Sequence, residues 1–169
     1  MATIPPVANY PISEDAFELV NLLQRVLTQV GDVFAANGVP LPTRQYWAVG
    51  TPAEDCAQVV VALSQLYLGG PGDAAAEPQR CEGVRSAVVN VYITRDYPIG
   101  EQGRAVAPER IIEASKWVAI DSWLLISSLK GFDWSAFGTP GAGVIATVNA
   151  LPPNGGVQTT VMNLTLAVM

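Results

Sequence analysis

Two adjacent carboxylates, Glu54 and Asp55, are the residues of this 169-residue chain whose types and spacing most suggest acid–base chemistry. General acid–base catalysis needs groups that converge on one reacting atom, and neighbouring residues of a loop rarely do so. The chain also contains no histidine, which removes the commonest general base and every Ser-His or Cys-His nucleophile. We therefore expect Glu54 and Asp55 to be solvated loop carboxylates, and we expect no catalytic residues.

The two cysteines, Cys56 and Cys81, do not form a CxxC unit. A disulfide between them would require the intervening loop to fold back on the strands that flank it. We interpret them as free, small apolar side chains, with the disulfide as the alternative. We expect neither a metal nor a cofactor.

A glycine-rich loop begins at Gly69 and continues through Gly70, Pro71 and Gly72 to Asp73. It lacks the Lys and Ser/Thr that complete a phosphate-binding loop, and it opens no helix, so a nucleotide site is not expected. A long loop at the tip of a hairpin is a common way to reach a partner.

The composition indicates a component of an assembly. Charged residues make up 14% of the chain, well below the quarter that is typical of soluble domains, and hydrophobic residues make up 50%. Few charges leave more surface that is neutral or buried in contacts, so we expect an oligomer. The net charge of −6 argues against a grip on nucleic-acid phosphates. The length predicts one domain, residues 13–169, preceded by an N-terminal arm, residues 1–12.

The sequence shows no targeting segment. Residues 1–11 have no basic start and no apolar run, and the apolar stretch from Trp117 to Leu129 is too short to span a bilayer. We expect the chain to stay in the cytoplasm and to contact no membrane. The glycosylation sequon at Asn163 is therefore expected to be a chance match.

Two long strands, Ala57–Leu68 and Val84–Arg95, form the expected centre of the fold, because β-branched residues dominate both. One face belongs in a core. It carries Val59, Val61, Leu63, Ala87, Val89, Val91 and Ile93. The opposite face is uncharged and half apolar, which predicts a second layer from this chain or from a neighbouring copy. It carries Gln58, Val60, Ala62, Ser64, Leu66, Val88, Asn90, Tyr92 and Thr94.

Two helices and three shorter strands complete the prediction. The first helix spans Ser13–Asn37, with an inward stripe through Val20, Leu23, Leu27, Val30 and Phe34. The second spans Pro108–Leu129, with a face through Ile111, Ala114, Val118, Ser122, Leu125 and Leu129, and it is apolar nearly all round. The other strands are Arg44–Gly50, Val144–Leu151 and Val157–Met169. We predict an α+β fold, an antiparallel or mixed β-sheet of about five strands with two main helices packed on one face.

The aromatic residues Phe132, Trp134 and Phe137 follow the second helix. They could line a ligand pocket, but aromatic residues after a buried helix more often plug a core, and we expect the core role here.

Several segments together resemble the tail terminator proteins of long non-contractile-tailed bacteriophages, in particular those predicted in phages of actinobacteria. These segments are Ser13–Asn37, Glu54–Val59, Gly69–Gly72, Arg80–Glu82 and Arg95–Pro98. The resemblance implies a hexameric ring that caps the tail tube, stops its polymerisation and joins it to the connector or stopper protein of the neck. It also implies that DNA passes through the ring without specific binding.

The same resemblance suggests where contacts would lie, with simple exposure or burial in the monomer as the alternative. Ring contacts are placed on Val60, Ala62, Ser64, Asn90, Tyr92 and Thr94. Docking contacts are placed on Gly69, Gly70, Gly72, Asp73, Arg80, Glu101 and Arg104. Other candidates are a head-tail connector or stopper, a tail tube protein, a small hydrolase using Asp or Glu, and a monomeric small-molecule binder.

Overall fold

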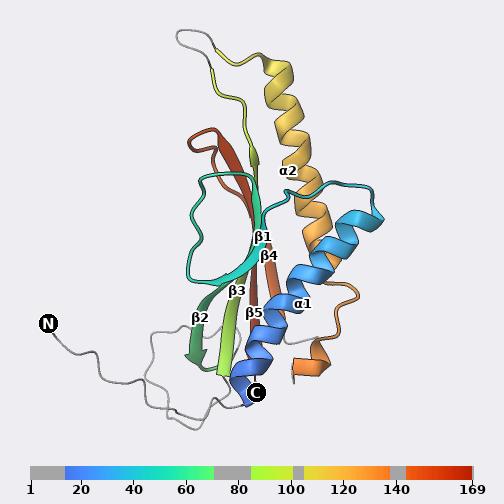
Figure 1. Cartoon of the computed structure of the whole chain (residues 1–169), viewed down its shortest axis with the longest axis vertical. Coiled ribbons are helices and arrows are strands. Elements are labelled where there is room, and N and C mark those ends of the chain that lie inside the picture. The colour runs from blue at the N-terminus through green and yellow to red at the C-terminus, as the bar shows by residue number, and fades with distance from the viewer. Residues whose placement is uncertain (1–13, 71–84, 101–104, 138–143, 169) are drawn as a thin grey trace, which may run out of the picture.

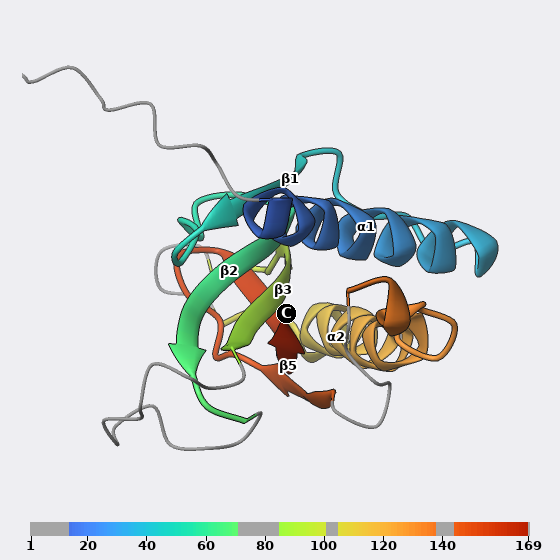
Figure 2. The same ribbon diagram turned by 90° about the horizontal axis from the view of Figure 1, so that it is seen from below.

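The computed structural model describes residues 14–70, 85–100, 105–137 and 144–168, and it confirms the α+β prediction. Five strands form one mixed sheet in the order β1-β2-β3-β5-β4. Both main helices cover the same face of this sheet (Figures 1 and 2). The elements are α1 Glu14–Ala36, β1 Gln45–Val49, β2 Gln58–Leu68, β3 Arg85–Asp96, α2 Pro108–Ser128, η1 Trp134–Phe137, β4 Ile145–Ala150 and β5 Val157–Val168. The predicted arm, residues 1–12, lies outside the described residues.

β1 runs parallel to β2, and every other pair of neighbouring strands is antiparallel. The hairpin of β2 and β3 pairs from Gln58 opposite Thr94 to Leu63 opposite Val89, after which a bulge shifts the register. The extra residue of a bulge reverses the alternation of side chains along the strand. Leu66 therefore lies beside Ala87 on the helix side, and its expected place on the opposite face was wrong.

The core fills the space between the sheet and the two helices. All seven residues predicted to face inward on β2 and β3 are buried there, together with Leu22, Leu23, Val26, Leu27, Val30 and Phe34 of α1. Val20, which was predicted to continue the inward stripe of α1, remains 39% exposed. Trp134 is buried in this core and packs on Phe132, with 4.3 Å between ring centroids, so these two residues act as the predicted core plug. The side chain of the third predicted aromatic residue, Phe137, lies outside the part that the structure describes.

The inward face of α2 overlaps the predicted face only in part: Leu125 is buried and Leu129 packs against the core, as predicted. Its buried residues are Asp121, Leu124, Leu125 and Ser128. Ile111, predicted to be inward, is exposed, and Trp123 is 68% exposed. The error arises because a helix that is apolar all round carries no pattern from which its orientation can be read. No helix in the described ranges is long and apolar enough to cross a membrane.

An ion pair with a buried carboxylate joins the sheet to the inward side of α2. Arg95, at the end of β3, donates from Nε and Nη2 to the two carboxylate oxygens of Asp121, at 2.6 and 2.7 Å. The same guanidinium donates to the carbonyl of Pro40 (3.1 Å) and lies 5.0 Å from the ring centroid of Trp117. Burial raises the pKa of the Asp121 carboxyl, and the hydrogen bonds from Arg95 oppose that rise.

Candidate interaction surfaces

The helix-free face of the sheet is half covered by the chain itself. Figure 1 shows the connection between β1 and β2 on the side of the sheet away from the helices. Beneath this side lies a second, smaller apolar cluster of buried residues. It consists of Val60, Ala62, Tyr92 and Val161, with Tyr46, Ala48 and Leu151 packed against it. The second layer predicted for this face is therefore supplied, over half its length, by the same chain.

Four of the six predicted ring contacts are buried in the monomer. Val60, Ala62, Tyr92 and Thr94 are buried inside the monomer, so their side chains are out of reach of a neighbouring copy. Ser64 is exposed and Asn90 is half-buried. The sequence could not reveal this division, because a loop that folds over a sheet face leaves no periodic pattern in its own residues.

The part of the helix-free face that stays open is uncharged and polar. Asn90 donates through Nδ2 to Ser64 Oγ (2.8 Å) and to Tyr92 OH (3.1 Å). Its Oδ1 atom is buried and has no hydrogen-bond partner within the described ranges. Asn163 lies directly opposite Asn90 on β5. This patch can offer neutral donors and acceptors but no charge.

Gln58 holds the covering connection in place. It is fully buried, accepts a hydrogen bond from Tyr46 OH (3.1 Å) and donates to the carbonyl of Ala53. We expect Gln58→Ala to lower the free energy of unfolding by about 1–3 kcal/mol, because it strands buried polar groups. The same variant should also raise the rate of amide hydrogen exchange across residues 53–57. The control variant Gln65→Ala, at an exposed site of the same strand, should change the free energy of unfolding by less than about 0.5 kcal/mol. Unchanged hydrogen exchange in Gln58→Ala would show that Gln58 does not hold the connection in place.

The two predicted docking loops leave opposite ends of the sheet. One follows the end of β2 and the other follows the end of β3, a strand of 12 residues that spans about 40 Å. Gly69 is buried and its carbonyl accepts a hydrogen bond from Ser86 Oγ (2.6 Å), while the Gly70 carbonyl accepts one from Tyr67 OH (3.3 Å). The other predicted docking residues, Gly72, Asp73, Arg80, Glu101 and Arg104, lie outside the described residues.

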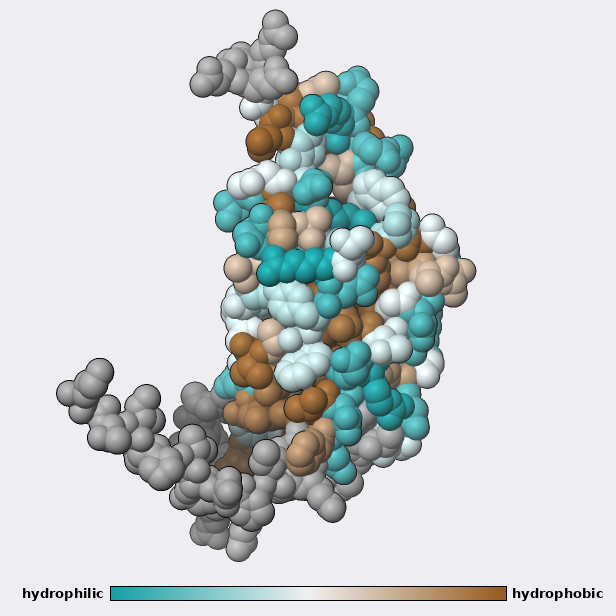
Figure 3. Space-filling model, viewed as in Figure 1, coloured by the Kyte–Doolittle hydropathy of each residue, from teal (hydrophilic) through white to brown (hydrophobic). Residues whose placement is uncertain are grey.

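Large apolar side chains remain uncovered in several regions, among them Phe17 of α1 and Ile99 after β3. Figure 3 shows apolar surface at the lower end of the molecule and along its helical side. The lower end of the sheet, where β2 finishes, exposes Leu66 and Leu68. The outer side of α2 exposes Ile112, Ile120, Trp123 and Ile126. The two edge strands expose Trp47, Val49 and Ile145.

The residues first considered for chemistry do not converge. Asp55 is 64% exposed and forms an ion pair with Arg44, whose Nη1 lies 3.3 Å from Oδ1. The same Nη1 donates to Cys56 Sγ (2.9 Å), and Cys56 is a free thiol. Glu54 is half-buried beside them. Cys81 lies outside the described residues.

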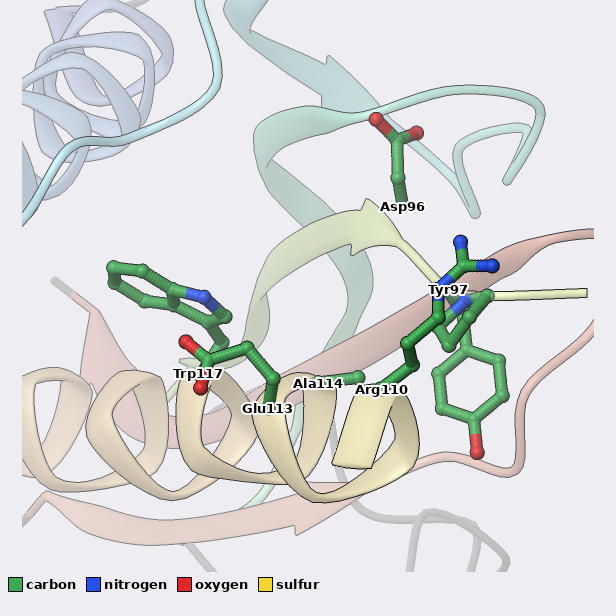
Figure 4. A pocket seen from close by; sticks show the side chains of 7 residues that line it. Asp96, Tyr97, Arg110, Glu113, Ala114 and Trp117 are labelled. Atoms are coloured by element: carbon green, nitrogen blue, oxygen red, sulfur yellow. The ribbon is translucent and has the colours of Figure 1, made fainter. Parts of the chain in front are cut away.

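A cavity of about 330 Å³ lies between the end of β3 and the first turns of α2 (Figure 4). Asp96, the last residue of the strand, and Tyr97, which follows it, line one side of the cavity, and Arg110, Glu113 and Trp117 of the helix line the other. The carboxylates of Asp96 and Glu113 point away from each other, so they do not form an acid pair. Within the described ranges, no three His, Cys, Asp or Glu side chains gather as metal ligands would.

Comparison of the chain with protein-family models and with curated protein sequences finds no match.

Proposed function

We propose that this chain is a structural protein of a phage tail: a tail terminator that forms a ring, caps the tail tube and joins it to the neck. One observation supports this most. The monomer leaves large apolar side chains uncovered at both edges of its sheet and at one end, while charged residues make up 14% of the chain. Uncovered apolar surface in a charge-poor chain is typical of a subunit that is completed by neighbours.

The exposed regions match the contacts that such a subunit needs. A ring subunit must meet a neighbour on each side, through two different surfaces that fit each other. Exposed apolar residues lie on both lateral edges, at Val49 of β1 and at Ile145 of β4. A third group, Leu66 and Leu68, lies at one end, where a tube would be met.

The loops proposed for docking fit the same scheme. Because they leave opposite ends of β3, one can meet the tail tube while the other meets the connector or stopper. The open helix-free patch around Ser64 and Asn90 carries no charge, which suits a protein past which DNA moves without being held. In this proposal the protein is assembled in the host cytoplasm and resides in the virion, at the junction of tail and neck.

Electron microscopy and native mass spectrometry of the purified chain, with and without tail tube protein, test the proposal. We expect a ring in solution or a cap at one end of assembled tubes, and shorter tubes when the chain is present during tube polymerisation. A chain that remains monomeric and leaves tube length unchanged would overturn the proposal. A chain that polymerises into tubes by itself would indicate a tail tube protein, and binding to the head connector alone would indicate a stopper.

A further inference from the structure

The two edge strands of the sheet carry unused backbone groups. On β1, the first and last bonds to β2 fix the pattern: the N–H of Val59 donates to the carbonyl of Arg44 (2.8 Å), and the N–H of Gly50 donates to the carbonyl of Leu63 (2.9 Å). Bonding to a parallel neighbour alternates along a strand, so the even-numbered residues of β1 bond to β2. The odd-numbered residues direct their N–H and C=O groups to the open side. They are Gln45, Trp47 and Val49.

β4 presents the same arrangement at the other edge. The N–H of Leu151 donates to the carbonyl of Thr159 (2.8 Å), in the register that pairs Ala150 with Thr160. In an antiparallel ladder, bonded and non-bonded pairs alternate, so the odd-numbered residues of β4 bond to β5. The even-numbered residues direct their backbone groups outward. They are Ala146, Val148 and Ala150. In the part of the chain that the structure describes, neither set has a backbone partner.

The outward residues of the two edge strands match in number and spacing, and the directions of the two strands allow them to pair. Each offers three outward residues at every second position. Crossing the sheet from β2 to β4 reverses the strand direction three times, so β4 runs opposite to β1. The β4 edge of one copy therefore meets the β1 edge of the next as an antiparallel pair when both copies point the same way.

The two edges also agree on which face carries the helices. Trp47 lies beside the core residue Val61, and Val148 lies opposite the core residue Met162, so both side chains are on the helix side. Residues that exchange backbone bonds across an antiparallel pair share one face. A β4–β1 junction thus continues the sheet without turning it over, and the helices of every copy stay on the same side.

Among the residues that the structure describes, neither edge strand carries the usual protection against pairing. Proteins usually shield edge strands with Lys, Pro, bulges or very short length. β1 (QYWAV) and β4 (IATVNA) contain no charged residue and no proline, and they expose Val49 (75%) and Ile145 (50%). Without a partner, such edges would be sites of aggregation.

We propose that copies of this chain join head to tail by pairing β1 of one copy with β4 of the next, which continues the sheet around the ring. At full overlap, Trp47 lies opposite Val148 of the next copy, and the three bonded pairs exchange about six backbone hydrogen bonds. This inference depends on the self-association in the proposed function and identifies its contact. Head-to-tail pairing satisfies both edges of every copy, whereas a β1–β1 dimer leaves both β4 edges open.

Disulfide trapping tests the pairing directly. In this register Ala48 faces Thr147 of the next copy as a non-bonded pair, with Cα atoms about 4.5 Å apart, a spacing that a disulfide can bridge. The double variant Ala48→Cys/Thr147→Cys, made with Cys56→Ser and Cys81→Ser, should form a ladder of covalent oligomers on mild oxidation. Each single variant in the same background should remain uncrosslinked. Efficient dimers from Ala48→Cys alone would overturn the head-to-tail arrangement.

Proline variants provide an independent measurement. Val49→Pro and Ala150→Pro each remove one outward N–H and no bond within the monomer. We expect both to weaken association about tenfold or more while the far-UV circular dichroism of the monomer is retained. Trp123→Ser, on the outer side of α2, should leave association unchanged. Rings that form normally in both proline variants would overturn the edge pairing and leave the proposed function standing. A wild-type chain that stays monomeric with its tube partner would overturn both.

Discussion

Replacing Arg95 by methionine should lower the free energy of unfolding by about 3–5 kcal/mol, because it leaves the carboxylate of Asp121 buried without a compensating charge. Asp121 is 1% exposed, and both of its oxygens accept hydrogen bonds from Arg95. The substitution also removes the hydrogen bond to the Pro40 carbonyl. Urea denaturation at neutral pH measures the loss.

The effect should depend on pH in a defined direction. Burial raises the pKa of Asp121 in the folded chain, and loss of the opposing guanidinium raises it further. The folded state then binds a proton more readily than the unfolded state, so the contribution of Asp121 to stability is present at low pH and is lost as the pH rises through its folded pKa. The deficit of Arg95→Met relative to the wild type should therefore be smaller at about pH 5 than at neutral pH. An equal deficit at both pH values would contradict this account.

Two control variants separate the ion pair from general damage. The double variant Arg95→Met/Asp121→Leu replaces both charges by apolar groups and should recover most of the lost stability. Lys116→Met breaks an exposed ion pair with Glu113 on the same helix and should cost less than about 0.5 kcal/mol. A double variant as unstable as Arg95→Met would show that the loss comes from packing and not from an unpaired charge.

Leu124→Ala should destabilise the chain by about 2–5 kcal/mol, whereas Ile111→Ala should cost less than about 1 kcal/mol. Both residues lie on α2, but Leu124 is 5% exposed and packs in the main core, while Ile111 is 38% exposed. The sequence pattern alone would place Ile111 inward, so the pair of variants tests the orientation of the helix. Thermal or urea unfolding of both variants gives the answer, and a larger loss for Ile111→Ala would show that the helix is turned the other way.

The sequence by itself predicted the elements and the inner face of the central hairpin. β-branched residues at every second position leave few alternatives to a strand, and the buried residues Val59, Val61, Val89 and Val91 lie where alternation placed them. Gly and Pro marked the connections, and the order of elements led to the α+β fold with both helices on one face. These features are local, so local chemistry determines them.

The tertiary structure decided which surfaces stay open. A helix as uniformly apolar as α2 carries no signal for its inward side, and the Arg95–Asp121 pair joins residues 26 positions apart. A charged residue inside an apolar helix, such as Asp121, indicates a buried partner of opposite charge. Nothing in the sequence around Arg95 identified it as that partner. The cover over Val60 and Tyr92 and the unpaired edges of β1 and β4 also arise only when distant segments meet. The periodicity of the sequence predicts which side chains are buried. The packing of segments that are distant in the sequence determines which residues bury them.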